Sequence, residues 1–357
     1  MSDWRIYRGA GTPHEGISRL PKPPPWRDFA PRAEAGERDD TARRLGVQRR
    51  LVESLHPRQH EVEAVNAALY LRRPLLVTGD PGTGKSTLAH AVAYELGLGR
   101  VLRWPIVSRT TLQDGLYRYD AIGRLQDVQL DRARAAAREA APVPAVEALP
   151  APASGEAPPG GEAAGRPSIG DYIRLGPLGT ALLRAPEGSQ RVLLVDELDK
   201  GDTDFPNDLL NVLEEGEFTI PELERSPEER VRVRTDDGEW ATVERGRVRC
   251  EAFPFIVLTS NGERTFPAAL LRRCIPLELV APDPQQLAAM VTAHLGPDAL
   301  SDGAELIGEF LRREPGEVIA NDQLFNALFF NQRAHGAEPA TRRRIAEMLL
   351  HRLDRSR

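Results

Sequence analysis

The chain has 357 residues, of which 41% are apolar and 28% are charged, and its formal net charge is −6. This composition predicts a globular protein of two domains, or of one domain with a smaller appendage, and excludes a largely disordered chain. The negative charge argues against a nucleic-acid partner bound without regard to sequence. Its two cysteines, Cys250 and Cys274, are too few for a disulfide framework and indicate a reducing compartment.

The amino-terminal end lacks the apolar core of a secretory signal, and no apolar run approaches the roughly 20 residues of a membrane helix. We therefore expect a cytoplasmic protein without a membrane partner. Residues 1–57 predict an amino-terminal arm, proline-rich as far as residue 37, that ends in a helix closed by Pro57. Two interpretations of the arm stay open: packing on the protein's own surface, or docking to a neighbouring subunit or partner.

Residues 58–73 have helical spacing and lead into an apolar run, 74–78, that predicts a buried strand. A glycine-rich segment of the form G-x-x-x-x-G-K-[ST] follows, and a helical pattern continues from it to Gly97. This arrangement directs backbone N–H groups and the positive end of a helix dipole at one point, where a phosphate can bind. The candidate nucleotide-binding residues are Gly79, Asp80, Pro81, Gly82, Thr83, Gly84, Lys85, Ser86 and Thr87.

Two side chains of this segment have predicted roles of their own. Lys85 would reach the β- and γ-phosphates of a nucleotide, and the Ser86 hydroxyl would ligate Mg²⁺. The competing interpretation is a chance match in a glycine-rich loop. The strand predicted before the segment and the helix predicted after it both favour the phosphate-binding interpretation.

The next part of the chain mixes structured and unstructured patterns. Residues 101–107 predict a second strand, and the apolar spacing from Leu112 to Ile122 predicts a helical face after it. Residues 131–167 differ in kind: 132–138 can continue a helix, and from Ala141 the run of Ala, Pro, Gly and Glu contains too little apolar surface to offset the entropy of ordering. We expect this segment to be a disordered insertion within one domain.

Three further apolar runs predict buried strands, at 191–195, 255–259 and 275–279. Between the first two, residues 218–252 alternate with a period of two around an Asp-Gly turn, which predicts a β-hairpin insertion. Helical spacing over 281–357 predicts four amphipathic helices in a small bundle. The fold class is therefore α/β: a parallel sheet with helices on both faces, followed by a small all-helical domain.

Two acids, Asp196 and Glu197, end the strand predicted at 191–195. A carboxylate at the carboxyl end of a parallel strand beside the phosphate loop can hold Mg²⁺, directly or through water, and this is the role expected of Asp196. Glu197 can activate a water for in-line attack on the γ-phosphate. Acids at solvated strand ends are common, so the pair gains its significance from the phosphate loop upstream.

Together these segments resemble the AAA+ ATPases, specifically the MoxR-type branch, from about Val62 to the end of the chain. The resemblance implies a P-loop NTPase core at 58–280, a helical lid at 281–357, and ATP and Mg²⁺ as cofactors. Besides the phosphate loop, it rests on Leu193-Leu194-Val195-Asp196-Glu197-Leu198-Asp199-Lys200, Leu258-Thr259-Ser260-Asn261-Gly262-Glu263-Arg264 and Leu271-Arg272-Arg273-Cys274.

The resemblance also implies roles for polar residues outside the phosphate loop. Asn261 matches sensor 1, which polarises the attacking water or senses the γ-phosphate; a plain turn residue before Gly262 is the alternative. Arg273 matches an arginine finger acting on the neighbouring subunit, with Arg272 as the competing choice, Arg264 as a distant third, and a solvated surface pair as the alternative.

One departure from the family pattern concerns sensor 2, an arginine that AAA+ lids often carry. The matching region here, Ile319-Ala320-Asn321-Asp322-Gln323-Leu324-Phe325, contains no arginine. Arg333 and the run 342–344 are out of register, so we assign no sensor 2.

The resemblance implies an ATP-hydrolysing ring, hexameric in form, that remodels or activates a partner protein. A partner with a von Willebrand A domain is implied by the resemblance alone. The hairpin insertion contributes to the central surface of the ring in members of the family. A nucleotide-gated scaffold with little turnover is the competing hypothesis, and a DNA-acting motor is a third that the net charge disfavours.

Overall fold

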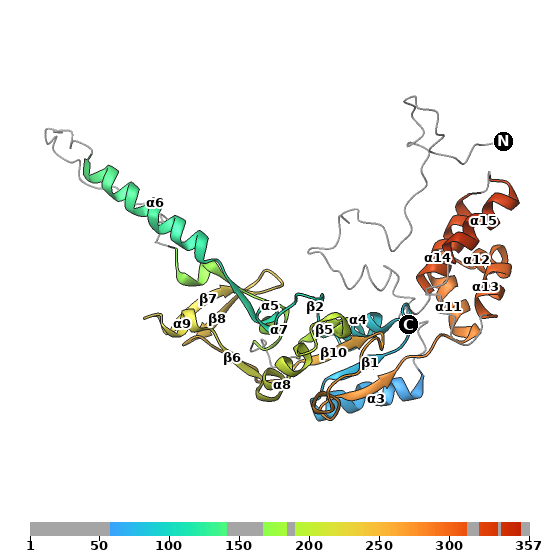
Figure 1. The fold of residues 1–357 in the computed structure, drawn as a ribbon, viewed down its shortest axis with the longest axis horizontal. Helices are drawn as coiled ribbons and strands as arrows, with labels where there is room; N and C mark the ends of the chain where they lie inside the picture. The colour runs from blue at the N-terminus through green and yellow to red at the C-terminus, as the bar shows by residue number, and fades with distance from the viewer. Residues whose placement is uncertain (1–57, 141–166, 184–189, 313–320, 335–336, 351–357) are drawn as a thin grey trace, which may run out of the picture. The chain divides into compact units, whose positions relative to one another are not determined.

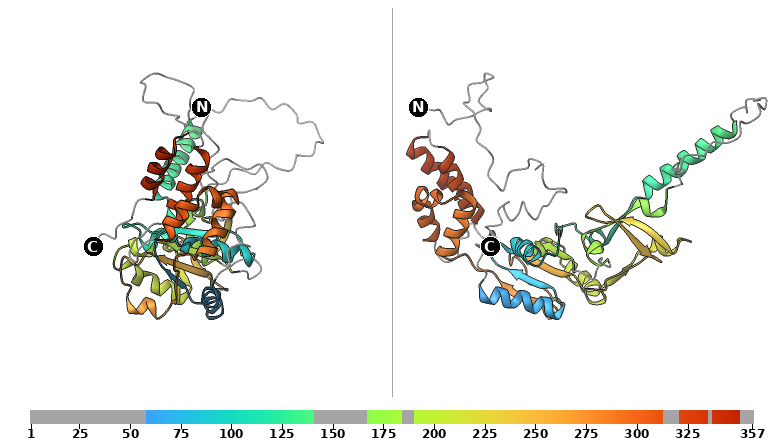
Figure 2. Two further views of the ribbon diagram at one scale, coloured as in Figure 1. Left: turned by 90° about the vertical axis from the view of Figure 1, so that its right-hand side faces the viewer. Right: turned by 180° about the vertical axis from the view of Figure 1, so that it is seen from behind.

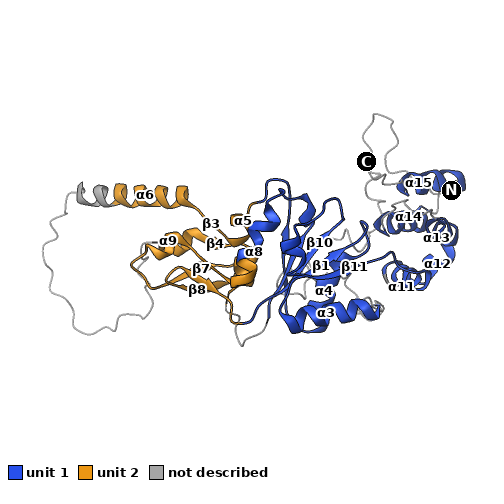
Figure 3. Ribbon diagram, turned by 60° about the horizontal axis from the view of Figure 1, so that its bottom comes forward, with its two compact units in different colours: residues 1–110, 185–211, 252–357 blue, residues 111–184, 212–251 orange. Residues whose placement is uncertain are grey.

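The structure, a computed structural model, describes residues 58–140, 167–183, 190–312, 321–334 and 337–350. The chain divides into two compact units, of which the second consists of Thr111–Arg184 and Val212–Glu251 and the first of the remainder (Figure 3). The predicted arm at 1–57 lies outside the described residues. The division into arm, core and lid stays a prediction.

The first unit contains a five-stranded sheet in which every neighbouring pair of strands is parallel. Its strands, in spatial order, are β11 (Ile275–Glu278), β1 (Leu75–Thr78), β10 (Phe255–Ser260), β5 (Val192–Asp196) and β2 (Val101–Pro105). All residues of β5 and β10 are buried, because these strands are covered on both faces. The predicted parallel α/β sheet is confirmed.

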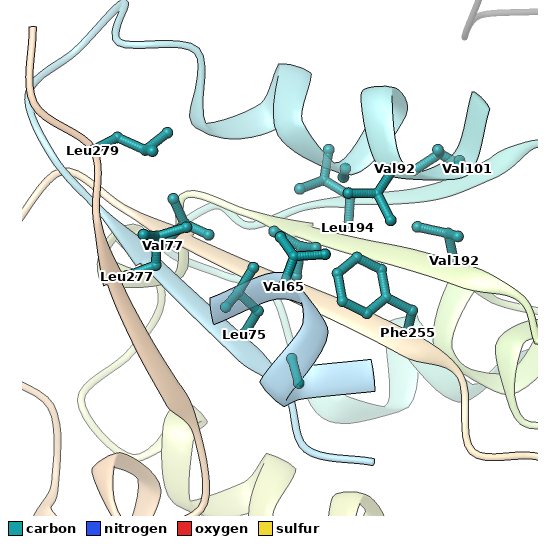
Figure 4. Close-up of a cluster of buried hydrophobic side chains, with 14 residues drawn as sticks. Val65, Leu75, Val77, Val92, Val101, Val192, Leu194, Phe255, Leu277 and Leu279 are labelled. Carbon is teal, nitrogen blue, oxygen red and sulfur yellow. The ribbon is translucent and has the colours of Figure 1, made fainter. Parts of the chain in front are cut away.

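One face of this sheet packs against two helices, α3 (Gln59–Leu71) and α4 (Lys85–Glu95). Figure 4 shows the core between them, where Val65 of α3 and Val92 of α4 lie over strand residues such as Val77, Leu194 and Phe255. The strand residues alternate in direction, so every second apolar side chain contributes to this layer.

The opposite face packs against α8 (Phe205–Glu215). The ring of Phe205 meets Trp104 of β2 edge-on, with ring centroids 5.4 Å apart, and both side chains are buried. Helices thus cover both faces of the sheet, as the sequence predicts. The carboxyl ends of the strands stay open for the loops that carry polar residues.

The carboxyl-terminal part of the first unit is helical (Figures 1 and 2) and has a hydrophobic core of its own. The sequence predicts four helices there, and the described residues contain a fifth, short one, α12. The helices are α11 (Pro284–Leu295), α12 (Asp298–Asp302), α13 (Ala304–Leu311), α14 (Asn321–Arg333) and α15 (Pro339–Leu349). Asp283 caps α11 by accepting hydrogen bonds from the backbone N–H groups of Gln285 (2.9 Å) and Gln286 (2.8 Å).

The second unit is built on a six-stranded sheet. Its strands, in spatial order, are β3 (Tyr117–Tyr119), β4 (Ile173–Leu175), β7 (Arg230–Arg234), β8 (Trp240–Glu244), β9 (Arg247–Arg249) and β6 (Glu217–Thr219). Strands β7 and β8 pair as a hairpin around Asp237-Gly238, where Gly238 has a φ of +93°. The predicted hairpin is therefore part of a larger sheet, because the preceding segment supplies β3 and β4.

Two sequence predictions in the second unit are wrong. Residues 131–140, predicted as the start of a disordered insertion, belong to α6 (Ala121–Ala140), since alanine and arginine favour helix strongly. Residues 141–166 lie outside the described residues. The predicted helical face from Leu112 to Ile122 is interrupted, because α5 (Leu112–Leu116) is short and Tyr117–Tyr119 form β3.

Candidate functional site

The phosphate loop connects β1 to α4 at the carboxyl end of a central strand. Gly79, Gly82 and Gly84 have φ angles of +146°, +78° and +92°, which side-chain-bearing residues rarely adopt. Gly84 is the residue that caps the start of α4, so the unpaired N–H groups of the first helical turn face the loop. This geometry suits a phosphate group.

Gly79 is required by space as well as by its backbone angle. A Cβ atom at this position would lie 2.3 Å from the carbonyl oxygen of Leu279, which directly follows β11. The amide of Leu279 in turn donates to the carbonyl of Thr78 at 2.8 Å. The loop therefore leaves the sheet in close contact with the neighbouring strand.

Lys85 points back along the loop. Its Nζ atom donates to the carbonyl oxygens of Gly79 and Asp80, each at 2.8 Å, and its side chain is buried. Burial lowers the pKa of Lys85, and the nearby carboxylates of Asp199, Asp80 and Asp196 oppose that shift in this order. The ammonium is thus held at the loop, where it can meet an incoming phosphate.

Ser86 joins the loop to the second predicted part of the site. Its hydroxyl donates to Oδ1 of Asp196 at 2.6 Å, so the two residues expected to hold Mg²⁺ are in direct contact. Both supply oxygen atoms, the donors that Mg²⁺ prefers. Within the described residues no cluster of three or more His, Cys, Asp or Glu could hold a metal ion. Two protein oxygens fit a Mg²⁺ that arrives with phosphate oxygens and water as its other ligands.

The second oxygen of Asp196 has a partner that the sequence analysis did not predict. Arg103 of β2 donates to Oδ2 from Nη2 at 2.7 Å and from Nε at 3.1 Å. Thr259 of β10 donates to Oδ1 at 2.9 Å. Burial alone would raise the pKa of Asp196, but hydrogen bonds from Ser86, Arg103 and Thr259 outweigh it, so the pKa is lowered and the carboxylate is charged.

Glu197 follows with a left-handed backbone, at φ +62° and ψ +51°. Its N–H donates to Oγ1 of Thr259 at 2.8 Å, which fixes the turn after β5. Its carboxylate accepts a hydrogen bond from Lys200 Nζ at 2.7 Å, and both side chains are exposed to 44%. Because the pair is so exposed, it contributes little to stability.

Asn261 lies just beyond β10, where a buried acid holds its backbone. Oδ2 of Asp199 accepts the N–H groups of Asn261 (2.9 Å) and Glu263 (3.2 Å), and Asp199 is 2% exposed. Ser260 accepts the N–H of Gly262 at 3.0 Å. The loop that carries Asn261 is therefore tied to the end of β5, beside Glu197.

The arginine-finger candidates lie elsewhere in the first unit. Arg272 and Arg273 follow α10 (Ala268–Leu271) and precede β11, so they are at the amino end of that edge strand. The phosphate loop is at the carboxyl end of β1, which pairs with β11 in parallel. Four strand residues separate these two ends, which is roughly 13 Å.

The contacts of these arginines differ. Arg273 Nη1 donates to the carbonyl of Ala269 at 3.1 Å, and the carbonyl of Arg272 accepts from Arg73 at 3.3 Å. Arg264, the third candidate, donates to the carbonyl of Gly201 at 2.8 Å. No sensor 2 is assigned, since the matching region 319–325 contains no arginine, and its first two residues lie outside the described residues.

Three residues of the site were missed by sequence reasoning: Arg103, Asp199 and Thr259. A weak signal existed for Arg103, a single charge within the otherwise apolar run predicted as the second strand. Asp199 and Thr259 were part of the quoted motifs without a role. Their functions depend on which strands become neighbours, which no local pattern reveals.

A glycine-rich loop at the end of a central parallel strand, hydrogen-bonded to an aspartate on the next strand but one, defines a P-loop nucleoside triphosphatase fold. The chain matches the AAA domain (dynein-related subfamily) over residues 74–274, more than half of its length, and it belongs to that family. AAA domains bind nucleotide and generally hydrolyse ATP, typically with Mg²⁺. No curated protein shows significant similarity to the chain. The described helices include none that is long and apolar enough to cross a membrane.

Proposed function

We propose that this chain is a MoxR-type AAA+ ATPase that assembles into a ring, hexameric in form, and uses ATP hydrolysis to remodel or activate a partner protein. The observation that carries the proposal is the 2.6 Å hydrogen bond between Ser86 and Asp196, which joins residues 110 positions apart at the end of a parallel sheet. The hydroxyl and the carboxylate are two oxygen ligands of the kind that Mg²⁺ prefers, and they lie beside a buried lysine that can meet a phosphate.

Each residue of the site has a distinct task in this proposal. Lys85 and the loop amides bind the phosphates, and Ser86 and Asp196 hold Mg²⁺, which neutralises phosphate charge when bound. Glu197 accepts a proton from the attacking water, and Asn261 orients that water. Lys200 Nζ donates to Oε2 of Glu197 at 2.7 Å, which leaves the other carboxylate oxygen to accept the proton.

Ring formation is supported by the position of Arg273. This residue is roughly 13 Å of strand away from the phosphate loop of its own chain, at the other end of β11. An arginine there is poorly placed for its own nucleotide, but it can complete the site of a neighbouring copy across a subunit boundary. Its guanidinium would stabilise charge that develops on the transferred phosphate.

The MoxR-type branch is supported by the order of the quoted motifs and by the second unit. The two segments of this unit, 111–184 and 212–251, come before and after β5 in the sequence. A von Willebrand A-domain partner rests on the family resemblance. The competing function, a nucleotide-gated scaffold, is favoured by one observation, the Glu197–Lys200 ion pair at 2.7 Å, which keeps the proposed base occupied.

Steady-state ATPase activity measured against protein concentration tests the proposal. We expect the specific activity of the wild type to rise with concentration and that of Arg273→Ala to stay low, because the active site is shared. Arg272→Ala is the matched variant that identifies which arginine acts. Glu197→Gln should bind ATP without hydrolysing it, and Lys85→Ala should not bind it. A flat, very slow rate that ignores Arg273 would instead support the scaffold.

A further inference from the structure

The six-stranded sheet of the second unit carries a row of arginines across three adjacent strands, and a tryptophan continues the row on the fourth. Cα pairing places Arg118 of β3 opposite Arg174 of β4, Arg174 opposite Arg234 of β7, and Arg234 opposite Trp240 of β8. Residues paired in this way project from the same face of a sheet. All three arginines are exposed.

The same face continues along β7, whose residues alternate between exposed arginines and buried valines. Val231 and Val233 are 2% and 0% exposed, so the other face of this strand is core. Arg232 joins the row on the exposed side. We call Arg118, Arg174, Arg232, Arg234 and Trp240 the arginine face.

Several basic residues on this sheet are neutralised by acids of the same unit. Arg230 pairs with Glu244 at 2.9 Å, and Arg247 pairs with Glu217 at 3.1 Å. Arg118 lies 3.6 Å from Asp114. In these pairs the charge of the arginine is balanced within the unit, so no external partner is needed to explain the arginine.

The centre of the arginine face is different. Arg174, Arg232 and Arg234 have no carboxylate partner among the described residues. Arg174 donates to the backbone oxygen of Asp236 at 3.0 Å, and the guanidinium carbons of Arg232 and Arg234 lie 5.2 and 4.8 Å from the centroid of the Trp240 ring. Like charges directly opposite each other on a sheet are destabilising. The row of arginines therefore lowers the stability of the second unit when no partner is bound.

The arginine face does not reflect an excess of basic residues in this part of the chain. In residues 212–251 acidic side chains outnumber basic ones, yet the arginines gather on one sheet face. A bound anion would remove the repulsion within the row. Arginine and tryptophan are also the residues that contribute most often to the centres of protein interfaces.

We propose that the arginine face docks an acidic segment of the partner protein; the proposal rests on the partner-directed part of the proposed function and names the chemistry of that partner. The planar guanidinium matches a carboxylate with two parallel hydrogen bonds. Alternate side chains of an extended segment are roughly 7 Å apart, which matches the spacing of Arg232 and Arg234 along β7.

An acidic polypeptide fits this face better than a nucleic acid does. Trp240 is 39% exposed, but two guanidinium groups lie 5.2 and 4.8 Å from its ring centroid, so a stacking base would have to displace them. The net charge of −6 disfavours a long polyanion, whereas a short acidic segment can be matched to Arg174, Arg232 and Arg234.

Binding of a fluorescein-labelled polyglutamate peptide to the full chain, followed by fluorescence anisotropy, tests this proposal. We expect Arg232→Gln/Arg234→Gln to weaken binding about tenfold at low salt, since two exposed charge contacts are lost. The matched control, Arg343→Gln/Arg344→Gln on α15, removes the same charge from exposed residues elsewhere and should bind like the wild type. Circular dichroism verifies that each variant is folded.

Three outcomes would overturn the proposal: no binding of polyglutamate by the wild type, equal weakening by both double variants, or tighter binding of an oligothymidylate that Arg232→Gln/Arg234→Gln abolishes. The last result would assign the face to single-stranded nucleic acid. ATPase activity is measured on the same samples. Peptide binding without any ATP turnover would refute the proposed ATPase activity but support the docking surface. ATP turnover without peptide binding would support the ATPase activity but refute the docking surface.

Discussion

Arg103 is bound to the carboxylate that the proposed function assigns to Mg²⁺. Two of its nitrogen atoms, Nη2 and Nε, lie 2.7 and 3.1 Å from Oδ2 of Asp196. Ser86 and Thr259 occupy the other oxygen. A positive charge therefore already neutralises Asp196, and a metal ion must compete with it for that charge.

We predict that Arg103→Gln lowers the Mg²⁺ concentration needed for nucleotide binding. The ion pair is half-exposed, with side-chain exposures of 38% and 7%, so its loss should lower the half-saturating Mg²⁺ concentration by only about two- to fivefold. Fluorescence of an ATP analogue, titrated with Mg²⁺, reads this without requiring turnover. Arg100→Gln, an exposed arginine just before β2, is the control. A higher Mg²⁺ requirement in Arg103→Gln would mean that Arg103 holds Asp196 in place for the metal.

Asp199 positions the loop of Asn261, so Asp199→Asn should reduce turnover more than ATP binding. The charge-assisted hydrogen bonds to the N–H groups of Asn261 and Glu263 become weaker, and we expect a fall in kcat of about tenfold. Asp208→Asn makes the same chemical change on the exposed side of α8 and should be silent. Equal losses of kcat and of ATP affinity would show that Asp199 acts through Lys85 instead.

Gly79→Ala should lower the melting temperature far more than Gly99→Ala does, although both glycines have positive φ angles. At Gly99 a Cβ meets nothing within 4 Å, so only backbone strain of about 1–2 kcal/mol is expected. At Gly79 the added carbon would clash with the Leu279 carbonyl, so this peptide must shift and strain the hydrogen bond from the Leu279 N–H to Thr78 of β1. Thermal unfolding of the two variants separates strain from clash. Similar melting temperatures would mean that the loop can shift freely.

Acidification should destabilise the helical part of the first unit through His294. Burial against groups that include the Phe325 ring, 4.9 Å away, lowers the pKa of His294 below its usual 6.5. The unfolded chain then takes up a proton before the folded chain does, so stability falls as the pH drops through 6.5 toward the folded pKa. His294→Gln should reduce the loss in melting temperature between about pH 7.5 and 5.5. His60→Gln, at an exposed position on α3, should leave that loss unchanged.

The central strands β5 and β10 were predictable because they are buried on both faces and form continuous apolar runs. Leu193 and Val257, for example, are wholly buried whichever way they point. The phosphate loop was predictable for a related reason, since its chemistry is contained in consecutive residues. The prediction was wrong around Tyr117, whose apolar ring fits a helical pattern but is used in β3, where Leu175 pairs with it.

The rest of the site depends on contacts between distant residues. Arg103 alternates with buried neighbours in β2 and so resembles any solvent-facing strand residue. Only the pairing of β2 with β5, which sets Arg103 beside Leu194 and two positions from Asp196, gives it a role. The same holds for Thr259, because the pairing of β10 with β5 sets Leu258 beside Val195 and so brings the Thr259 hydroxyl to Asp196.

The place of β10 in the sheet has a consequence for how the protein is made. This strand lies between β1 and β5, although it is the last of the three to leave the ribosome. Until residues 255–260 are synthesised and inserted, Ser86 and Asp196 cannot lie at their final separation, and the segments between them remain open loops of high closure entropy. A nascent or truncated chain that ends before Phe255 would therefore possess both sequence motifs but no nucleotide site. ATP could then stabilise the protein only after this late strand has joined, which couples ligand binding to completion of the sheet.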